Sequence, residues 1–505
     1  MKRALVVLAV MLPTLVEIID TSVVTVALDH IRGSLSAGLD EATWAVTSYL
    51  VANAIVIPIT GWLSRFFGRK LYLVSSVAVF TISSFLCGSA WSVGSLVFFR
   101  VIQGLGGGAL QPLSQSILLE SFPPEKHGAA MAIFGVGVMF GPIVGPLLGG
   151  WVTDNWSWPW IFYINIPIGI VSILLILLAI EDPPYARRKR MPIDAVGIAL
   201  LTVGVGSLQF VLDKGQREDW FSSSLIVGFS IVAAVFLGTL VIWEWYERNP
   251  VVDLRLFRDP NYALGNLVMF VAFLNLFGSI VLLPIFLQNL MGYTAFLAGV
   301  VLAPGGLATM LTMPAAGRIV DRGHAKWSMA GGMLVCALAS YQMSRFNLEA
   351  DFWSLMLPRI ILGAGIGFLF IPLMTLSMSH IPNERMSSAT AIFNFLRNIG
   401  GSVGVAYVTT ILARRAQFHQ NRLVDHLSPL DRGYRMAVDR AGQLLHLRGV
   451  GDLPPDALIH GELLRQSSML SFNDAFFTFV ILFLLLFPLA FVMKKGVPRP
   501  AALAH

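Results

Sequence analysis

The feature that most constrains this chain is a series of apolar stretches, each of about twenty residues, the length of helix that spans a bilayer. Of its 505 residues, 56% are hydrophobic and only 13% are charged, whereas a soluble domain has about 25% charged residues. The sequence therefore predicts an all-α polytopic membrane protein. We expect about fourteen spanning helices, near 5–28, 43–63, 71–91, 95–119, 128–152, 160–180, 193–212, 223–245, 263–290, 294–316, 327–344, 354–378, 387–412 and 473–493.

The basic residues indicate how these helices are oriented. They gather in alternate short loops, for example at 65–70, 187–190 and 318–326, and cytoplasmic loops carry such an excess of Lys and Arg. We therefore expect a multi-pass protein of a bacterial cytoplasmic (inner) membrane with both termini in the cytoplasm. The excess of basic over acidic residues, 35 against 29, is explained by this orientation, and no nucleic-acid partner is expected.

An internal repeat divides the chain. Residues 98–113 resemble 357–373, residues 123–137 resemble 382–396, and 61–70 resemble 317–326. We expect three parts: a six-helix bundle at 1–182, two inserted helices with cytoplasmic flanks at 183–259, and a second six-helix bundle at 260–505 that includes an outer loop at about 415–470. Alternating-access transporters are built from such repeats, with the path between them. Duplication alone does not prove transport.

The first apolar stretch carries two acidic residues. Thr14, Glu17, Asp20, Thr21 and Thr25 are spaced three to four residues apart and so share one helix face. Two carboxyl groups one turn apart repel when both are ionised, and burial disfavours each charge, so protonation of one of them becomes accessible near neutral pH. Asp20 is the first candidate for proton coupling and Glu17 the second. Alternatively, Asp20 only neutralises a buried arginine.

A polar stripe follows in the fourth stretch. Arg100 lies within an apolar run, where an isolated arginine costs about 2.5 to 3.5 kcal/mol, so it should face protein or a watered cavity. Gln103, Gly107, Gln111 and Gln115 recur at every fourth position behind it and predict the wall of a transport path. Arg100 either takes part in transport or is a static partner that holds the helix bundle together. Arg359, its repeat counterpart, and Arg397 are further candidates for the path.

The fifth stretch carries glycine at every fourth position, interrupted by two prolines. Small residues at this spacing allow close helix packing, and proline removes helix hydrogen bonds. The pattern predicts either a gate or tight packing alone, and a bulky residue would be harmful in both cases. Its residues are Gly137, Gly141, Pro142, Gly145, Pro146 and Gly149.

Several motifs together resemble the major facilitator superfamily, and within it the fourteen-helix drug:proton antiporters of the EmrB/QacA branch, EmrB-like members above all. They lie at 18–28, 47–63, 61–70, 98–108, 137–150, 156–170 and 193–197, so the resemblance covers nearly the whole chain. It implies a proton-coupled antiporter that exports hydrophobic or amphipathic drugs by alternating access, a multidrug efflux protein associated with antibiotic resistance.

The resemblance also implies roles for particular residues. Asp20 occupies the position of the family's first-helix aspartate, Arg100 that of an arginine assigned to proton transfer, and the glycine–proline helix marks exporters. The loop motif comprises Gly61, Arg65, Gly68 and Arg69. Its usual acidic residue is replaced here by Arg65, although the second-half copy keeps Asp321. The usual charge relay at the first gate is therefore not expected in its ordinary form.

The sequence says less about which residues contact the substrate. Apolar residues suited to lipophilic compounds, including cations held by aromatic faces, are candidates for a cavity: Met139, Phe140, Phe270, Phe273, Phe277 and Phe393. Protons and a lipophilic small molecule are the expected partners, with the bilayer around them. In a cell with two membranes, EmrB-like systems also use a periplasmic membrane-fusion adaptor and an outer-membrane channel, and the 415–470 segment is one plausible contact for the adaptor or a lid.

Two other functions stay open. A proton-coupled exporter of one specific metabolite uses the same fold, and a membrane enzyme or receptor is a remote alternative. The sequence contains no GxxxxGK[ST] phosphate loop and no HExxH motif. Its two cysteines, Cys87 and Cys336, are far apart in apolar runs. We therefore expect no enzymatic activity, no cofactor and no metal site.

Overall fold

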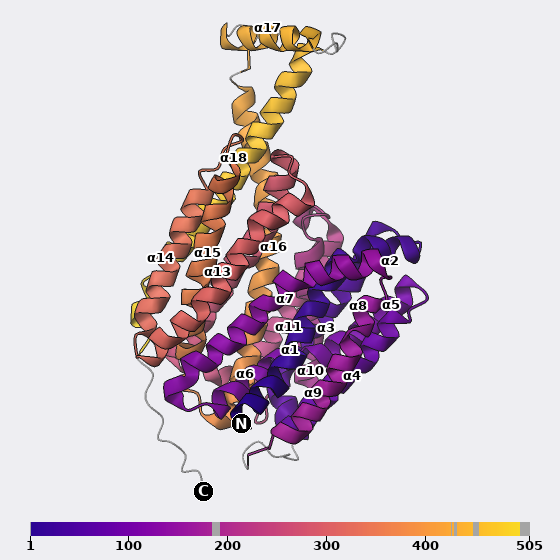
Figure 1. Ribbon diagram of the computed structural model, residues 1–505, viewed down its shortest axis with the longest axis vertical. Coiled ribbons are helices and arrows are strands. Elements are labelled where there is room, and N and C mark those ends of the chain that lie inside the picture. The colour runs from indigo at the N-terminus through magenta and orange to yellow at the C-terminus, as the bar shows by residue number, and fades with distance from the viewer. Residues whose placement is uncertain (1, 184–191, 426, 429–431, 448–453, 495–505) are drawn as a thin grey trace.

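The computed structural model describes residues 2–183, 192–425, 427–428, 432–447 and 454–494, which are helical almost throughout and contain no strand (Figure 1). The basic run at 187–190 lies outside these residues. The helices form a first group, a second group and an inserted pair. A slender extension rises from the second group at the end opposite to the start of the chain (Figure 1).

The first helix group extends from α1 to α9. Long α1 is central, because it packs against α7, α9 and α6. The fourth apolar stretch is two helices in line, interrupted at Gly108 and Ala109. The members of the group are α1 (Lys2–Val26), α2 (Leu28–Ser34), α3 (Leu39–Phe67), α4 (Arg69–Gly88), α5 (Val93–Gly107), α6 (Leu110–Ser121), α7 (His127–Asn155), α8 (Trp160–Tyr163) and α9 (Asn165–Ala179).

The second helix group extends from α12 to α19, with α15 packed between α13 and α14. Its first helix ends in a π-helical turn, Phe286–Leu290. The members are α12 (Pro260–Ile285), α13 (Ala295–Asp321), α14 (Ala325–Met343), α15 (Phe352–Met378), α16 (Met386–Val424), α17 (Arg432–Leu447), α18 (Pro455–Leu486) and α19 (Leu489–Val492).

The inserted pair consists of α10 (Ala195–Lys214) and α11 (Ser224–Tyr246). Asp194 caps α10 by accepting a hydrogen bond from the Gly197 amide at 2.8 Å, and it also accepts one from the Trp243 indole at 3.0 Å. α10 packs against both α3 and α16. The pair therefore contacts both groups, and most of α11 faces outward, as expected for a helix in contact with lipid.

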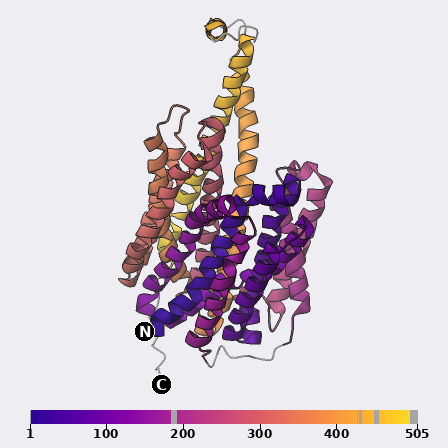
Figure 2. The ribbon, with the colours of Figure 1, turned by 45° about the vertical axis from the view of Figure 1, so that its right-hand side comes forward.

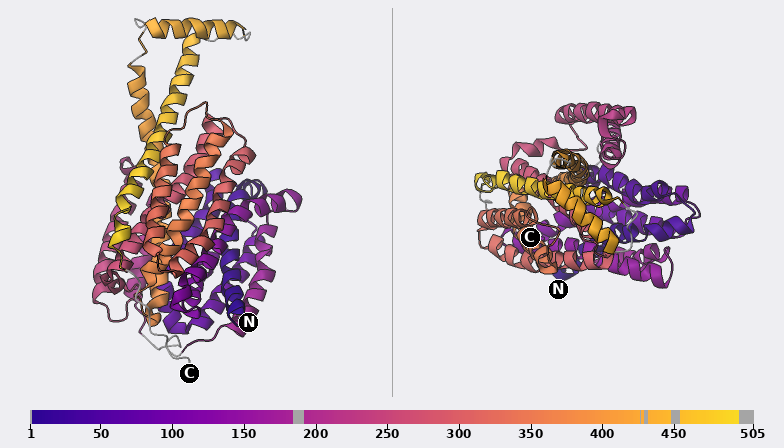
Figure 3. Two further views of the ribbon diagram at one scale, coloured as in Figure 1. Left: turned by 60° about the vertical axis from the view of Figure 1, so that its left-hand side comes forward. Right: turned by 90° about the horizontal axis from the view of Figure 1, so that it is seen from above.

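Twelve of the described helical segments are long and apolar enough to cross a membrane. α14 and α16 are not among them. α14 is rich in glycine, alanine and serine, and α16 carries arginine, asparagine and many hydroxyl side chains, so both have lower hydropathy. Both nevertheless run alongside the spanning helices (Figure 3). The count of fourteen spans stays a prediction.

The two groups are joined closely at the end where α1 begins, which is the predicted cytoplasmic end. A Cβ added at Gly128 in α7 would come within 2.4 Å of the Gly317 carbonyl oxygen in α13, so this crossing requires glycine. Asp321 accepts hydrogen bonds from the amides of Gly128 and Ala129 at 2.8 and 3.2 Å. Thr390 donates to the Pro112 carbonyl at 2.9 Å. The interface between the two groups is therefore closed at this end.

The described part of the segment at 415–470, which is predicted to be an outer loop, is largely helical. α16 continues twelve residues beyond the expected end at 412, α18 begins at Pro455, and α17 lies across the top of both (Figures 1 and 2). The expected end at 412 marked the end of the apolar stretch, and the helix itself continues beyond it. The position of this segment on the outer face stays a prediction. Asp474 joins the two long helices by accepting hydrogen bonds from Arg415 and His419 at 2.5 and 2.6 Å.

Candidate functional site

The centre of the first group holds a buried ion pair. The Arg100 guanidinium donates from Nη1 to Asp20 Oδ2 at 2.6 Å, and the two side chains are 0% exposed. Arg100 also donates from Nε to the Ala45 carbonyl at 2.8 Å and lies over the Tyr49 ring, 4.2 Å from its centroid. The prediction that Arg100 faces protein is confirmed.

Amide side chains complete the surroundings of Asp20. Gln103 and Asn165 donate to Asp20 Oδ1 at 3.0 and 2.7 Å, and both amides also contact Ser84 Oγ. Gln103 accepts from Arg100 Nη1 at 2.6 Å. Asp20 thus receives at least three hydrogen bonds, two from α5 and one from α9. Arg100 Nη2 has no hydrogen-bond partner.

A second carboxylate lies one turn away. Glu17 Oε1 accepts from the Tyr49 hydroxyl at 3.1 Å and from Asn53 at 3.3 Å, while Oε2 accepts from Gln111 at 2.6 Å. Among the described residues, no arginine or lysine lies within ion-pair distance of Glu17. The two carboxyl groups therefore have different partners: a cation for Asp20, and only neutral donors for Glu17.

Tyr49 joins the two carboxylates into one network. Its ring contacts the Arg100 guanidinium while its hydroxyl binds Glu17. On the predicted α1 face, Thr14, Glu17 and Asp20 are buried, Thr21 is partly buried and Thr25 is exposed. The shared face therefore ends near Asp20, because beyond it the side chain of Thr25 is no longer covered by neighbouring helices.

The glutamine stripe extends the network to the second group. Gln111 binds Glu17 through its amide nitrogen and accepts from Arg397 Nη2 in α16 through its oxygen. Gln115, one turn further, accepts from Asn394 at 2.6 Å. The structure thus brings together Asp20, Glu17, Arg100, Gln103, Gln111 and Arg397. The spacing predicted the shared face of α1 and the stripe of α5 and α6, but not their contact with Arg397, and the roles of these residues in proton coupling and in the path stay predictions.

The repeat counterpart of Arg100 has different surroundings. Arg359 in α15 is 8% exposed, and among the described residues its hydrogen-bond partner is Ser279, whose hydroxyl accepts from Nη1 at 3.2 Å. Its Nε has no partner, and none of the described carboxylates pairs with it. Arg359 and Arg100 therefore occupy equivalent positions in the repeat and are both buried, but Arg359 has no acidic partner among the described residues.

The glycine helix packs against α1 along the carboxylate region. A Cβ added at Gly141 would come within 2.3 Å of Ile18, and one at Gly145 within 2.4 Å of Ser22. Gly137 and Gly149 face Met11 and Val23, while Pro142 and Pro146 lie inside continuous α7. The predicted close packing is present, and a gating role stays a prediction.

The loop motif lies at the closed end. Gly61 meets Ser388 of the second group, Arg69 pairs with Glu120 at 2.5 Å, and Gly68 has a positive φ of 89°. Arg65 donates to the Pro250 carbonyl at 3.5 Å. Asp321 binds the first amides of α7, where a carboxylate is favoured by the helix dipole.

The candidate cavity residues do not share one environment. Phe393 is fully buried and Phe273 is 4% exposed, whereas Phe140 and Phe277 are each 40% exposed. Met139 and Phe270 are partly buried. Phe273 lies 5.9 Å from Phe277 and 5.4 Å from the Arg397 guanidinium. A substrate cavity lined by all six stays a prediction.

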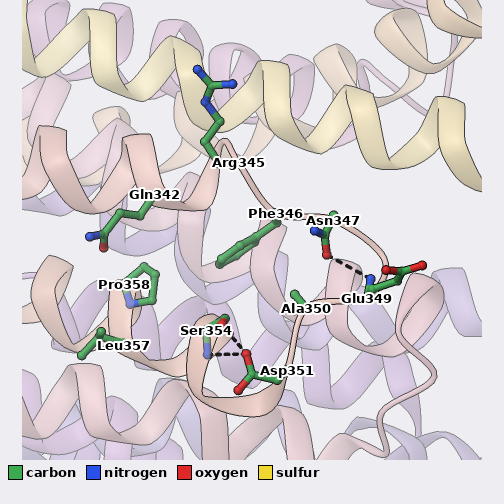
Figure 4. Close-up of a pocket in the computed structure, with 10 residues that line it drawn as sticks. All are labelled: Gln342, Arg345, Phe346, Asn347, Glu349, Ala350, Asp351, Ser354, Leu357 and Pro358. Carbon is green, nitrogen blue, oxygen red and sulfur yellow. Dashed lines mark hydrogen bonds between the residues drawn. The ribbon is translucent and has the colours of Figure 1, made fainter.

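A pocket with a volume of about 450 Å³ lies elsewhere, at the loop between α14 and α15 (Figure 4). Arg345, Glu349, Asp351 and Leu357 are among its lining residues, and none of the predicted site residues is. Asp351 caps α15 by accepting from Ser354, and these hydrogen bonds hold the pKa of Asp351 below its ordinary value. The pocket is therefore a feature of the surface loop, separate from the network at Asp20.

Sequence reasoning missed several members of the network. Tyr49, Asn53, Ser84 and Asn165 were not singled out, although all are polar residues within apolar helices. Buried polar side chains in a membrane require partners, so Asn165 between two isoleucines was the most accessible signal. Ser84 and Tyr49 carry hydroxyls that often bind their own helix backbone, which makes such a role harder to recognise.

Comparisons with known proteins agree with this architecture. The Major Facilitator Superfamily profile matches residues 10–405. The chain is 40% identical over 471 residues to "Multidrug export protein EmrB" of Haemophilus influenzae, covering 93% of this chain and 91% of that protein. It is 36% identical over 491 residues to "Fatty acid resistance protein FarB" of Neisseria gonorrhoeae, covering 97% and 96%.

The fold is also found among solved structures. The crystal structure of the human organic anion transporter MFSD10 (TETRAN) superposes with a TM-score of 0.64 at 13% identity, covering 97% of this chain and 99% of that chain. At an identity this low, the superposition shows only that the two proteins share a fold. Together with the profile match, the spanning helices and the relatives of nearly equal length, it establishes that this multi-pass membrane protein belongs to the major facilitator superfamily.

Proposed function

We propose that this protein is a proton-coupled antiporter that exports lipophilic small molecules by alternating access. The observation that carries the proposal is the buried network in which α1 presents two carboxyl groups, one paired with Arg100 and one held by neutral donors. Relatives named for multidrug export and for fatty acid resistance support export and a lipophilic substrate.

The two carboxyl groups suit different tasks. Asp20 forms an ion pair that breaks if it is protonated, because a neutral carboxyl no longer attracts Arg100. That change releases α5 and α9 from α1, and α1 in turn packs on the α7 glycines. Asp20 is thus the proposed proton-coupling residue. Glu17 is placed next to the junction between the groups, where protonation would alter the contact with Gln111.

The two helix groups are the proposed moving units, with boundaries near 182 and 260 and the inserted pair between them. The tight contacts of Gly128, Gly317 and Asp321 form the closed gate in this conformation. We place the protein in a bacterial inner membrane with both termini in the cytoplasm. The extension formed by α16, α17 and α18 then projects outward, where it could contact a periplasmic adaptor.

The experiment uses inside-out membrane vesicles with an acidic lumen. A lipophilic substrate added outside should cause proton leakage in the native protein. In Asp20→Asn, leakage should vanish while the folded protein remains in the membrane. Asp29→Asn, an exposed residue of α2, is the matched control and should leak like the native protein. Leakage that survives in Asp20→Asn moves the proton site to Glu17, and no leakage from the folded native protein with any of a broad panel contradicts drug antiport.

A further inference from the structure

The junction between the two helix groups contains a three-residue bridge. Glu17 belongs to α1, Gln111 to α6 and Arg397 to α16. The Gln111 amide donates to Glu17 Oε2 at 2.6 Å and accepts from Arg397 Nη2. A neutral amide therefore stands between a carboxylate of the first group and a guanidinium of the second.

Arg397 lacks partners for its charge. It is 6% exposed, its Nη1 has no hydrogen-bond partner, and none of the described acidic side chains lies within ion-pair distance of it. A guanidinium has five N–H donors, and burying a cation without compensation is costly. A carboxylate would satisfy it better than the Gln111 oxygen does, because two parallel hydrogen bonds to an anion are the strongest arrangement for arginine.

The surroundings of Arg397 also suit an apolar chain. The guanidinium lies 5.4 Å from the Phe273 ring, which in turn lies 5.9 Å from Phe277, and Phe277 is 40% exposed. Gln111 is partly exposed, so the bridge formed by Glu17, Gln111 and Arg397 is not completely buried. Arg359, the other buried arginine of the second group, binds Ser279 and has no such amide in front of it.

We propose that Arg397 binds the carboxylate of a lipophilic organic anion, which displaces the Gln111 oxygen while its apolar chain lies along Phe273 and Phe277. This deepens the proposed export function, on which it rests, by naming the charge of the substrate. A bound carboxylate and an ionised Glu17 compete for the same cation, since only one amide separates Glu17 from Arg397. The selectivity of the path is therefore for anions, in contrast to the aromatic capture of cations.

The test uses full-length protein in nanodiscs and two fluorescent probes of equal length, dansyl-undecanoic acid and its methyl ester. The native protein should bind the acid at least about tenfold more tightly than the ester. Arg397→Gln should bind both equally, and Arg359→Gln should keep the preference. Glu17→Gln should bind the acid more tightly than the native protein, because the competing carboxylate is gone.

The substitution at Arg397 itself requires a control for folding. Arg397→Lys keeps the charge but loses the planar fork, so it should show a smaller preference for the acid. In the native protein, dodecanoate should displace the acid probe, and dodecyltrimethylammonium should not. Equal binding of acid and ester by the native protein, or a preference that survives Arg397→Gln, would overturn the proposal.

The same probes separate this inference from the export function. Transport of the ester into vesicles, measured with its proton leakage, tests export without a negative charge on the substrate. If the ester is transported and the acid has no advantage in binding, export stands and the anion site is refuted. If the acid binds preferentially while neither probe nor any member of the broad panel is transported, the anion site stands and export is refuted.

Discussion

Arg100 and Arg359 occupy equivalent positions in the two helix groups, yet their surroundings are opposite. Arg100 pairs with Asp20 at 2.6 Å within a shell of amides, whereas Arg359 has one serine at 3.2 Å. Both side chains are buried. The repeat therefore preserved the cation in both halves, while only the first half has a carboxylate beside it. A buried charge with a partner can be switched by a proton, and one without a partner cannot.

The largest expected effect comes from removing each arginine in turn. Arg100→Met leaves Asp20 as an uncompensated buried charge, and breaking a buried pair in this way costs about 3 to 5 kcal/mol of stability. Arg359→Met leaves no carboxylate behind and fills similar space with an apolar chain, so it should be neutral or stabilising. Thermal unfolding of the purified variants measures both. Equal losses would show that the two arginines are alike and would contradict the comparison.

The next effect separates stability from function at the Asp20 pair. If the loss in Arg100→Met comes from the stranded carboxylate, then adding Asp20→Asn should restore most of the stability, because neither charge remains. Proton leakage should stay absent in the double variant. A double-mutant cycle on unfolding, combined with the vesicle assay, measures both quantities. Additive losses would mean that the pair is not coupled, and restored leakage would refute a role for Asp20 in coupling.

The intact pair also shows what sequence reasoning could and could not reach. Helical spacing placed Glu17 and Asp20 on one face and Arg100, Gln103 and Gln111 in one stripe, because periodicity is a local property. Whether a partner exists across helices is not local. Asp20 and Arg100 are 80 residues apart, so their pairing could not be read from spacing. The missing partner of Arg359 could have been, because α12, the first helix of the second group, contains no Asp or Glu.

The same limit applies to the outer extension and to the α7 helix. Hydropathy located the spans but not the point at which α16 ends, since a helix can continue into water without any change in its hydrogen bonds. The glycine spacing in α7 predicted a close neighbour correctly. That this neighbour is α1, next to the carboxylates, follows only from the three-dimensional arrangement.

A smaller effect is expected on the α7 face, where two glycines offer a matched test. Gly141 would place a Cβ 2.3 Å from Ile18, whereas nothing lies within 4 Å of a Cβ at Gly150. Gly141→Leu forces α7 away from α1 and should cost about 1 to 3 kcal/mol, as overpacking does, together with a loss of export. Gly150→Leu should behave like the native protein. Thermal unfolding measures the stability and substrate efflux from cells measures the export of both variants. If Gly141→Leu and Gly150→Leu behaved equally, α7 would not hold α1 in place.

The smallest expected effect tests whether a carboxylate is all that the second group lacks. Ser279→Asp would place an acidic group where the Ser279 hydroxyl now meets Arg359. The gain in stability should be about 1 kcal/mol or less, because the desolvation of the new charge offsets most of the attraction. In the Asp20→Asn background, this new pair should not restore proton leakage, since the four regularly spaced glycines of α7, from Gly137 to Gly149, face α1 and not α12 or α15. Restored leakage would show that a buried pair in either group suffices for coupling, and the difference between the two arginines would then lie only in which half carries the carboxylate.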